Sequence, residues 1–184
     1  MAEAAEKKEF NMRSFPPWKI VTIVTTVILV TLCDQWTKQL VLNRFHWGES
    51  VSIIRSFFAL TYVRNMGAAF GIFHNAPAYL RDPFFIMVPI LAMVIIMAIL
   101  AKLKPDQKLT GLALSLVMGG AIGNLIDRVR FGYVVDFLDF HWKEVYHWPA
   151  FNVADSCIVI GVTYLFIDSF FQGNSSIGKS NSIL

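Results

Sequence analysis

Four apolar runs constrain this chain more than any other feature of its sequence. A helix of about 20 residues crosses a hydrocarbon core of about 30 Å, and each run approaches or exceeds that length. The chain is 55% hydrophobic and 16% charged, with a mean hydropathy of +0.54, which is too apolar for an ordinary soluble domain. We therefore predict one membrane domain over residues 16–171, with spans at about 18–42, 83–101, 109–130 and 150–171.

The two ends of the chain differ from this domain in composition. Residues 1–15 are polar and mixed in charge, without the basic-then-apolar order of a cleavable signal peptide, so we predict a cytoplasmic N-terminal extension. Residues 172–184 are rich in Gly, Ser and Asn, which predicts a disordered cytoplasmic tail.

At the second span, Asp82 followed by Pro83 predicts an N-cap and a first-turn proline.

The orientation in the membrane follows from a short basic link. Lys102, Lys104 and Lys108 lie within seven residues between the second and third spans, and Lys and Arg in short loops favour the cytoplasmic side. With four spans, both termini are then also cytoplasmic. The longer connections, about 43–81 and 131–148, are predicted to face outward.

Both outward connections have the composition of membrane-surface segments. Residues 51–63 are β-branched and aromatic with rough alternation, which predicts one or two strands. Residues 131–148 are rich in Phe, Tyr and Trp, side chains that favour the lipid headgroup region. The predicted fold class is thus an all-α membrane protein with four transmembrane helices and a small extracytoplasmic β-rich segment between the first and second helices.

Several classes of function are disfavoured by the sequence. The net charge of +3 comes from scattered Lys and Arg residues, which argues against a nucleic-acid partner. A zinc intramembrane protease is disfavoured, because no His-Glu-x-x-His helix occurs and all the histidines fall outside the spans: His46, His74, His141 and His147. No metal site is predicted. No histidine lies at the membrane depth of Ser115, which argues against a serine peptidase of the rhomboid type. No glycine-rich loop that could bind a phosphate follows a predicted strand. We expect no cofactor and infer no obligate protein partner.

Polar residues nevertheless collect near the outward ends of the spans. An ionisable group in a span costs about 2.5 kcal/mol or more, so each needs a partner or a function. Since helices linked as hairpins bring these ends to one depth, we predict a polar site at the outer leaflet boundary. Its candidate members are Asp34, Lys38, Asn124, Asp127, Arg128, Asp136, Asn152 and Asp155.

Some of these residues also have a purely structural interpretation. Asp34 and Lys38 are four residues apart on one helix, so they form a natural ion pair that ties this helix to its neighbours. Asp127 beside Arg128 is expected to be a scaffold pair. Residues 65–67, Asn-Met-Gly, are typical of a turn after a strand.

Asp136 and Asp155 differ because each lies among apolar residues without an adjacent basic residue. Asp139 is an alternative to Asp136, and context alone does not rank the two. Two carboxylates in a poorly hydrated site share one proton and titrate as a pair. Such a pair hydrolyses peptides when the ionised acid activates water and the protonated acid donates to the carbonyl oxygen.

Paired acids also occur in proton-coupled transporters, and this is the alternative function from another class. Its relay would use Asp34, Lys38, Asp127 and Arg128. Transporters usually contain internal repeats and helices broken near the midplane, and this sequence has no repeat. A purely structural subunit is a third possibility, which leaves the unpaired acids without a role.

Five short segments together make the chain resemble the lipoprotein signal peptidase family, also called signal peptidase II. The resemblance covers about residues 18–170, and its specificity comes from the joint order of the segments on four spans. They are Asp34-Gln35-Trp36-Thr37-Lys38, Asn65-Met66-Gly67-Ala68-Ala69-Phe70, Gly123-Asn124-Leu125-Ile126-Asp127-Arg128, Val134-Val135-Asp136-Phe137 and Phe151-Asn152-Val153-Ala154-Asp155.

The resemblance implies a role for each candidate residue. Asp136 and Asp155, and not Asp139, are expected to be the catalytic dyad of an aspartic endopeptidase. The residues expected to line the site are Asn65, Gly67, Asn124, Arg128 and Asn152, and those expected to hold the helices and the polar network are Asp34, Lys38 and Asp127.

It also implies a substrate and a location. The expected substrate is a bacterial prolipoprotein whose cysteine carries a diacylglyceryl group, cut on the N-terminal side of that cysteine. The expected location is the bacterial cytoplasmic (inner) membrane, with the active site near its outer face. Membrane lipid is the expected surrounding, and cyclic peptides of the globomycin type are expected inhibitors.

Overall fold

The structure, a computed structural model, describes residues 17–67, 77–143 and 145–180. The extension expected at 1–15 lies outside these residues, as does the end of the chain at 181–184. The described elements, in chain order, are α1 (Pro17–Arg44), β1 (Ser50–Ile54), β2 (Phe58–Asn65), α2 (Ala78–Lys102), α3 (Lys108–Phe131), β3 (Val134–Trp142), β4 (Tyr146–His147) and α4 (Val153–Ser180).

The four predicted membrane helices are confirmed, and α3 is the central one. In the described part of the chain, four helices are long and apolar enough to cross a membrane. α3 packs against α1, α2 and α4. Within its apolar stretch 56% of residues are buried, against 11% in each of the other three helices. On α1, α2 and α4, the faces turned away from the bundle carry exposed apolar side chains such as Leu29, Leu91 and Phe166, which suit contact with lipid.

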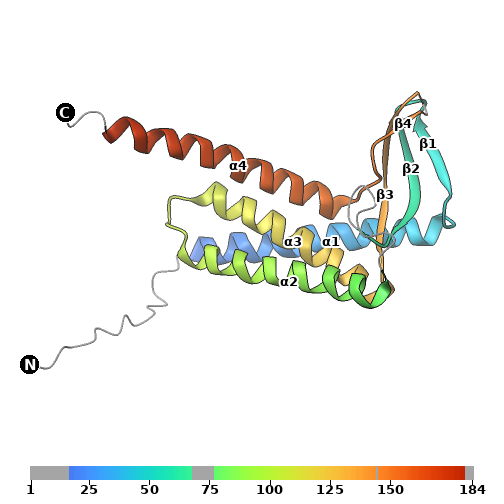
Figure 1. The fold of residues 1–184 in the computed structure, drawn as a ribbon, viewed down its shortest axis with the longest axis horizontal. Helices are drawn as coiled ribbons and strands as arrows, with labels where there is room; N and C mark the ends of the chain where they lie inside the picture. The colour runs from blue at the N-terminus through green and yellow to red at the C-terminus, as the bar shows by residue number, and fades with distance from the viewer. Residues whose placement is uncertain (1–16, 68–76, 144, 181–184) are drawn as a thin grey trace, which may run out of the picture.

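A small antiparallel sheet lies at one end of the helices (Figure 1). The strand order in the described residues is β1-β2-β3-β4. β1 and β2 confirm the strands predicted in the first outward connection. β3 and β4 come from the second connection, for which the sequence analysis predicted only aromatic, headgroup-facing character. β3 pairs with β2, far away in the sequence, with Asp136 opposite Val63 and Val134 opposite Asn65. Local patterning cannot reveal this long-range pairing.

The start of α2 differs from the prediction. The helix begins at Ala78, and Asp82 is not its N-cap. Instead Asp82 forms an ion pair with Arg81, with 2.9 Å between the Arg81 Nε and the Asp82 Oδ1. Pro83 lies inside the helix, where it removes the hydrogen bond that an N–H at this position would donate to the Tyr79 carbonyl oxygen.

The end of α4 also differs, because the helix continues to Ser180, beyond the predicted boundary at residue 171. It therefore includes part of the segment expected to be disordered. Once a helix is nucleated, each further residue adds one hydrogen bond at little extra cost, so a long apolar helix extends readily into a polar sequence.

Two contacts fix the ends of α3. At its start, the Lys19 ammonium of α1 donates to the Leu103 carbonyl oxygen at 2.8 Å, which joins the beginning of α1 to the α2–α3 link. At its finish, Gly132 has a φ of 77°, and its N–H donates to the Arg128 carbonyl oxygen at 3.0 Å. Glycine adopts this left-handed conformation without strain, so the chain turns directly into β3.

Close helix contacts depend on glycines of α3. A Cβ atom at Gly120 would collide with the Ala154 carbonyl oxygen at the start of α4. A Cβ atom at Gly123 would lie 2.5 Å from the Asp34 Oδ2 of α1. Small residues thus allow α3 to touch both neighbours where the polar residues gather.

We predict that Gly120→Ala destabilises the protein, because the added methyl meets backbone that cannot rotate away. Overpacking of this kind costs about 1–3 kcal/mol, more than the gain of about 1 kcal/mol in helix propensity. The measurement is the thermal unfolding midpoint of purified protein in detergent. The control is Gly111→Ala on the same helix, whose Cβ would meet only the Leu103 Cδ1 at 3.5 Å. A midpoint for Gly120→Ala equal to or above that of Gly111→Ala would contradict the prediction.

Candidate active site

A buried lysine is the centre of the polar network. The Lys38 ammonium lies 2.9 Å from the Asp34 Oδ2 and 2.9 Å from the Asp127 Oδ2, and it donates to the Asn124 Oδ1 at 2.9 Å. Lys38, Asp34 and Asp127 are each at most 2% exposed. The predicted Asp34–Lys38 ion pair is confirmed, and Lys38 also forms an ion pair with the carboxylate of Asp127.

The predicted pairing of Asp127 with Arg128 is wrong. Consecutive helical residues point about 100° apart, so Asp127 faces Lys38 while Arg128 points elsewhere. The Arg128 guanidinium donates to the main-chain oxygens of Asn124 and Gly67, each at 3.4 Å, and its carbon lies 5.1 Å from the centre of the Phe85 ring.

The two carboxylates beside Lys38 also bind main-chain amides of other elements. The Asp34 Oδ1 accepts from the Ala154 N–H in the first turn of α4 at 3.0 Å. The Asp127 Oδ2 accepts from the Val135 N–H of β3 at 3.0 Å. Gln35, which the sequence analysis gave no role, donates to the Asp127 Oδ1 at 2.8 Å. Its sequence signal is its place in the segment Asp34-Gln35-Trp36-Thr37-Lys38.

Asn152 and Asp155 cap the start of α4. The Asn152 Oδ1 accepts from the Asp155 N–H at 2.9 Å, and the Asp155 Oδ2 accepts from the Asn152 N–H at 3.3 Å. Such a reciprocal pair across three residues satisfies two of the amides that begin a helix without partners. The backbone of the helix start therefore fixes the position of the Asp155 carboxylate.

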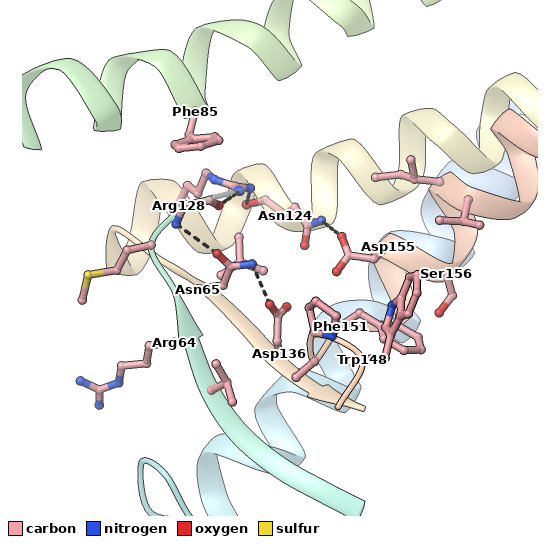
Figure 2. A pocket seen from close by; sticks show the side chains of 18 of the residues that line it. Arg64, Asn65, Phe85, Asn124, Arg128, Asp136, Trp148, Phe151, Asp155 and Ser156 are labelled. Atoms are coloured by element: carbon pink, nitrogen blue, oxygen red, sulfur yellow. Dashed lines mark hydrogen bonds between the residues drawn. The ribbon is translucent and has the colours of Figure 1, made fainter. Parts of the chain in front are cut away.

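Asparagine amides hold both dyad candidates (Figure 2). The Asp136 Oδ1 accepts from the Asn152 Nδ2 at 2.7 Å, and its Oδ2 accepts from the Asn65 Nδ2 at 2.9 Å. The Asp155 Oδ1 accepts from the Asn124 Nδ2 at 2.7 Å. Lys38 in turn orients Asn124. The Lys38 ammonium donates to the Asn124 side-chain oxygen, so the NH₂ group of Asn124 points to Asp155.

The surroundings of Asp136 favour its protonated form. Burial, followed by the negative charge of Asp155, raises the pKa of Asp136 to about 7, although hydrogen bonds from Asn65 and Asn152 act in the opposite direction. Near neutral pH this acid therefore exists in both forms. Because the two charges interact, the proton belongs to the pair.

Asp136 and Asp155 line one cavity of about 1040 Å³. Arg64, Asn65, Gly67, Asn124 and Arg128 line it as well, and apolar side chains from α2, α4 and the segment before α4 make up much of the remaining wall. Sequence reasoning gave no role in the site to the aromatic part of this wall: Phe85, Trp148 and Phe151.

The predicted site residues thus fall into two groups. The cavity-lining group includes Asn65, Gly67, Asn124 and Arg128 with the two acids. Asn152 and the three members of the ion network lie behind it, buried. The segment following Gly67, residues 68–76, lies outside the described residues.

Asp139, the alternative to Asp136, lies elsewhere. It is not among the described residues that line the cavity. Its Oδ1 is instead 3.1 Å from the His147 Nδ1. Of the described residues, those with side chains spaced as metal ligands are Asp139, His141 and His147, outside the cavity. The cavity itself offers two carboxylates held by amide donors, an arrangement that is chemically able to transfer protons.

Comparison with known proteins identifies the family. The family profile described as Signal peptidase (SPase) II matches residues 26–171. A lipoprotein signal peptidase of Syntrophotalea carbinolica is 49% identical over 85% of this chain and 94% of its own length. One from Geobacter metallireducens is 49% identical over 83% of this chain and 91% of its own.

A solved structure gives the same result for the fold. It is described as a bacterial membrane enzyme and superimposes with a TM-score of 0.73 at 34% identity, over 85% of this chain and 92% of that one. The matched region contains α2, α3 and the sheet in full, most of α1 and α4, and both acids of the cavity. This chain therefore belongs to the signal peptidase II family.

Proposed function

We propose that this protein is an aspartic endopeptidase of the membrane, which removes the signal peptide from diacylglyceryl-modified prolipoproteins on the N-terminal side of the modified cysteine. The observation that carries the proposal is the pair Asp136 and Asp155. Both line one cavity, both are held by neutral amides, and the nearby cation Lys38 is engaged by Asp34 and Asp127.

The proposed reaction uses one proton on the pair. The ionised acid, Asp155, accepts a proton from water while the water oxygen bonds to the scissile carbonyl carbon. Asp136 donates its proton to the carbonyl oxygen, which gives a neutral tetrahedral intermediate. The intermediate then collapses: the C–N bond breaks, the leaving nitrogen receives the proton held by Asp155, and a hydroxyl proton returns to Asp136.

Neutral asparagines suit this chemistry better than cations would. Asn65 and Asn152 fix the orientation of Asp136 with dipoles, so the carboxyl keeps a pKa of about 7 and is available as an acid. An ammonium or guanidinium at the same distance would favour the ionised form strongly and remove that acid. Arg128, which lines the cavity, is suited to hold main-chain carbonyl oxygens of a substrate, as it already binds that of Gly67.

The walls of the cavity suit a lipidated substrate. The dyad end is polar, while Ile158, Val159 and Ile160 extend the wall along α4, one of the membrane helices. A signal-peptide helix lying in the membrane would present its scissile bond at the dyad, and the diacylglyceryl chains would stay beside the apolar wall. Inhibitors of the globomycin type would compete for the same cavity.

The orientation proposed from the sequence agrees with the arrangement of the elements. Lys19 of α1 contacts the α2–α3 link, which carries Lys104 and follows Lys102 at the end of α2, at the end of the bundle away from the sheet (Figure 1). If this basic end is cytoplasmic, the sheet and the dyad face outward, in the cytoplasmic membrane of a bacterium, with both termini inside.

A proton-coupled transporter is disfavoured by the same contacts. Three of its four relay residues, Asp34, Lys38 and Asp127, are at most 2% exposed, lie outside the cavity wall and are joined through Lys38. Arg128, the fourth, lines the cavity and binds main-chain oxygens rather than this cluster. A relay needs groups that exchange protons with water on each side, and this cluster is enclosed.

We predict that Asp136→Asn and Asp155→Asn each reduce cleavage by at least about 100-fold, since general acid–base catalysis contributes roughly 10² to 10⁴. The measurement is the gel shift of a prolipoprotein incubated with purified enzyme in detergent. The substrate is supplied with and without its diacylglyceryl group, and only the modified form should shorten.

The matched control is Asp139→Asn, an acid of the same strand that faces away from the cavity and should leave cleavage intact. Gel filtration and thermal unfolding of all three variants separate loss of chemistry from loss of fold. Substantial cleavage by a folded Asp136 or Asp155 variant would refute the dyad, and cleavage of the unmodified substrate would refute the lipid requirement.

We also predict an alkaline limit to activity near neutral pH. Asp136 holds its proton below its pKa of about 7 and loses it as the pH rises, so the rate at low substrate concentration should fall about tenfold per pH unit above that point. Asn65→Leu removes a hydrogen bond that stabilises the ionised form, so the limit should move to higher pH.

The matched control is Asn43→Leu, an exposed asparagine at the end of α1, which should leave the profile unchanged. A rate that rises through pH 7 and stays high, or an identical limit in wild type and Asn65→Leu, would count against Asp136 as the acid.

A further inference from the structure

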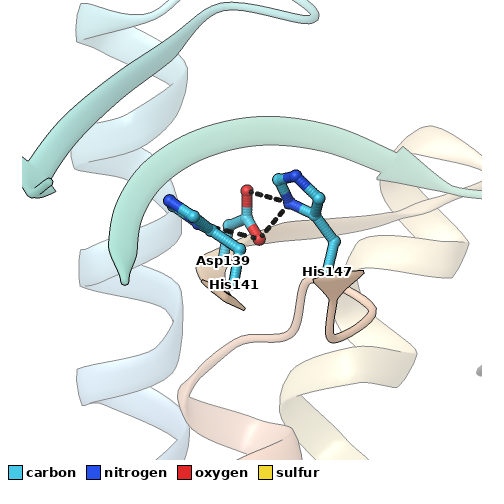
Figure 3. Close-up of side chains that lie close together, drawn as sticks. All are labelled: Asp139, His141 and His147. Carbon is cyan, nitrogen blue, oxygen red and sulfur yellow. Dashed lines mark hydrogen bonds and ion pairs between the residues drawn. The ribbon is translucent and has the colours of Figure 1, made fainter. Parts of the chain in front are cut away.

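We propose that Asp139, His141 and His147 form a binding site for a divalent transition-metal ion of the zinc class, separate from the cavity. One potential ligand atom from each side chain lies within 4.8 Å of the others (Figure 3). The inference does not rest on the proposed function, because it concerns binding at another place on the sheet.

The strands bring these residues together. Asp139 and His141 are two apart on β3, so both project from the same face of the strand. β4 pairs with β3 in antiparallel register with His147 directly opposite His141, which places the third side chain on that face too. Asp136 is three residues from Asp139 and therefore projects from the opposite face.

The distances between the potential ligand atoms are close to those between the ligand atoms of a coordinated metal ion. The His147 Nδ1 lies 3.1 Å from the Asp139 Oδ1, and the His141 Nδ1 lies 3.8 Å from the same oxygen. Two ligand atoms at about 2.1 Å from a tetrahedral zinc ion are about 3.4 Å apart. These two separations bracket that value and all three ligand atoms lie within 4.8 Å of one another, so side-chain rotations would complete the geometry.

His141 is the observation that a simple hydrogen-bonded cluster does not explain. Its side chain is 5% exposed, and its Nδ1 is buried without a hydrogen-bond partner among the described residues. A proton on the His147 Nδ1 bridges that ring to Asp139, but it leaves the His141 nitrogen unpaired, an unfavourable state for a buried polar atom. A metal ion replacing that proton would satisfy all three side chains at once.

The ligand types select the class of metal. Two imidazole nitrogens with one carboxylate oxygen suit Zn²⁺, Co²⁺ or Ni²⁺, whereas Mg²⁺ and Ca²⁺ favour oxygen ligands throughout. His147 is 51% exposed, so water can supply a fourth ligand from that side. The bound ion would join the short strand β4 to β3 and hold the hairpin on the outward side of the sheet.

Isothermal titration with Zn²⁺ tests the proposal. The protein is full-length, purified without a histidine tag, freed of metal with chelator and kept in detergent. Wild type should bind one equivalent. His147→Ala and Asp139→Asn should each weaken binding by more than the roughly 10- to 100-fold effect of losing an outer-shell partner. His46→Ala is the matched control, because it removes an exposed histidine outside the cluster and should bind like wild type.

Co²⁺ gives a second, spectroscopic measurement on wild type that does not depend on any variant folding. A low-symmetry site with nitrogen ligands should give visible absorption bands that Zn²⁺ abolishes on displacement. The proposal is overturned if wild type binds no Zn²⁺ at one equivalent, if folded His147→Ala binds as tightly as wild type, or if Co²⁺ remains fully hydrated in its spectrum.

Discussion

The contact of the Lys38 ammonium with Asp34 and Asp127 is the interaction on which the rest of the site depends. Three charged groups at most 2% exposed are stable only when each is paired, and removing one partner from such a group costs about 3–5 kcal/mol. One cation does not neutralise two carboxylates, so main-chain hydrogen bonds stabilise the remaining negative charge. The N–H groups of Ala154 and Val135 donate to Asp34 and Asp127.

Those two amides explain how a structural ion cluster positions the two acids of the proposed dyad. Asp34 holds the N–H of Ala154, the residue immediately before Asp155, and Asp127 holds the N–H of Val135, the residue immediately before Asp136. The main-chain N–H immediately before each dyad acid is therefore bound by a carboxylate that also contacts Lys38. α1, α3, β3 and the start of α4 meet there, and the glycines of α3 permit the approach.

Sequence predicted most of the fold because hydropathy and helix length are local properties. It also predicted the Asp34–Lys38 pair, since four residues on a helix bring two side chains to one face. It could not predict β3, whose partner strand β2 is distant in the chain, nor the choice of Lys38 over Arg128 as the partner of Asp127, which depends on how α3 is rotated against α1. Gln35 and the aromatic cavity wall have no recognisable spacing of their own.

The division of charge across the site also follows from these contacts. Lys38 is near enough to lower the pKa of Asp136, yet burial and Asp155 outweigh it and keep that pKa at about 7. If Lys38 contacted Asp136 directly, the acid would be ionised and unable to donate a proton. Asn124 separates the two roles, because its carbonyl oxygen accepts from Lys38 and its NH₂ group donates to Asp155. The Asn124 amide thus links the position of Lys38 to that of Asp155, while Lys38 itself forms its ion pairs with Asp34 and Asp127.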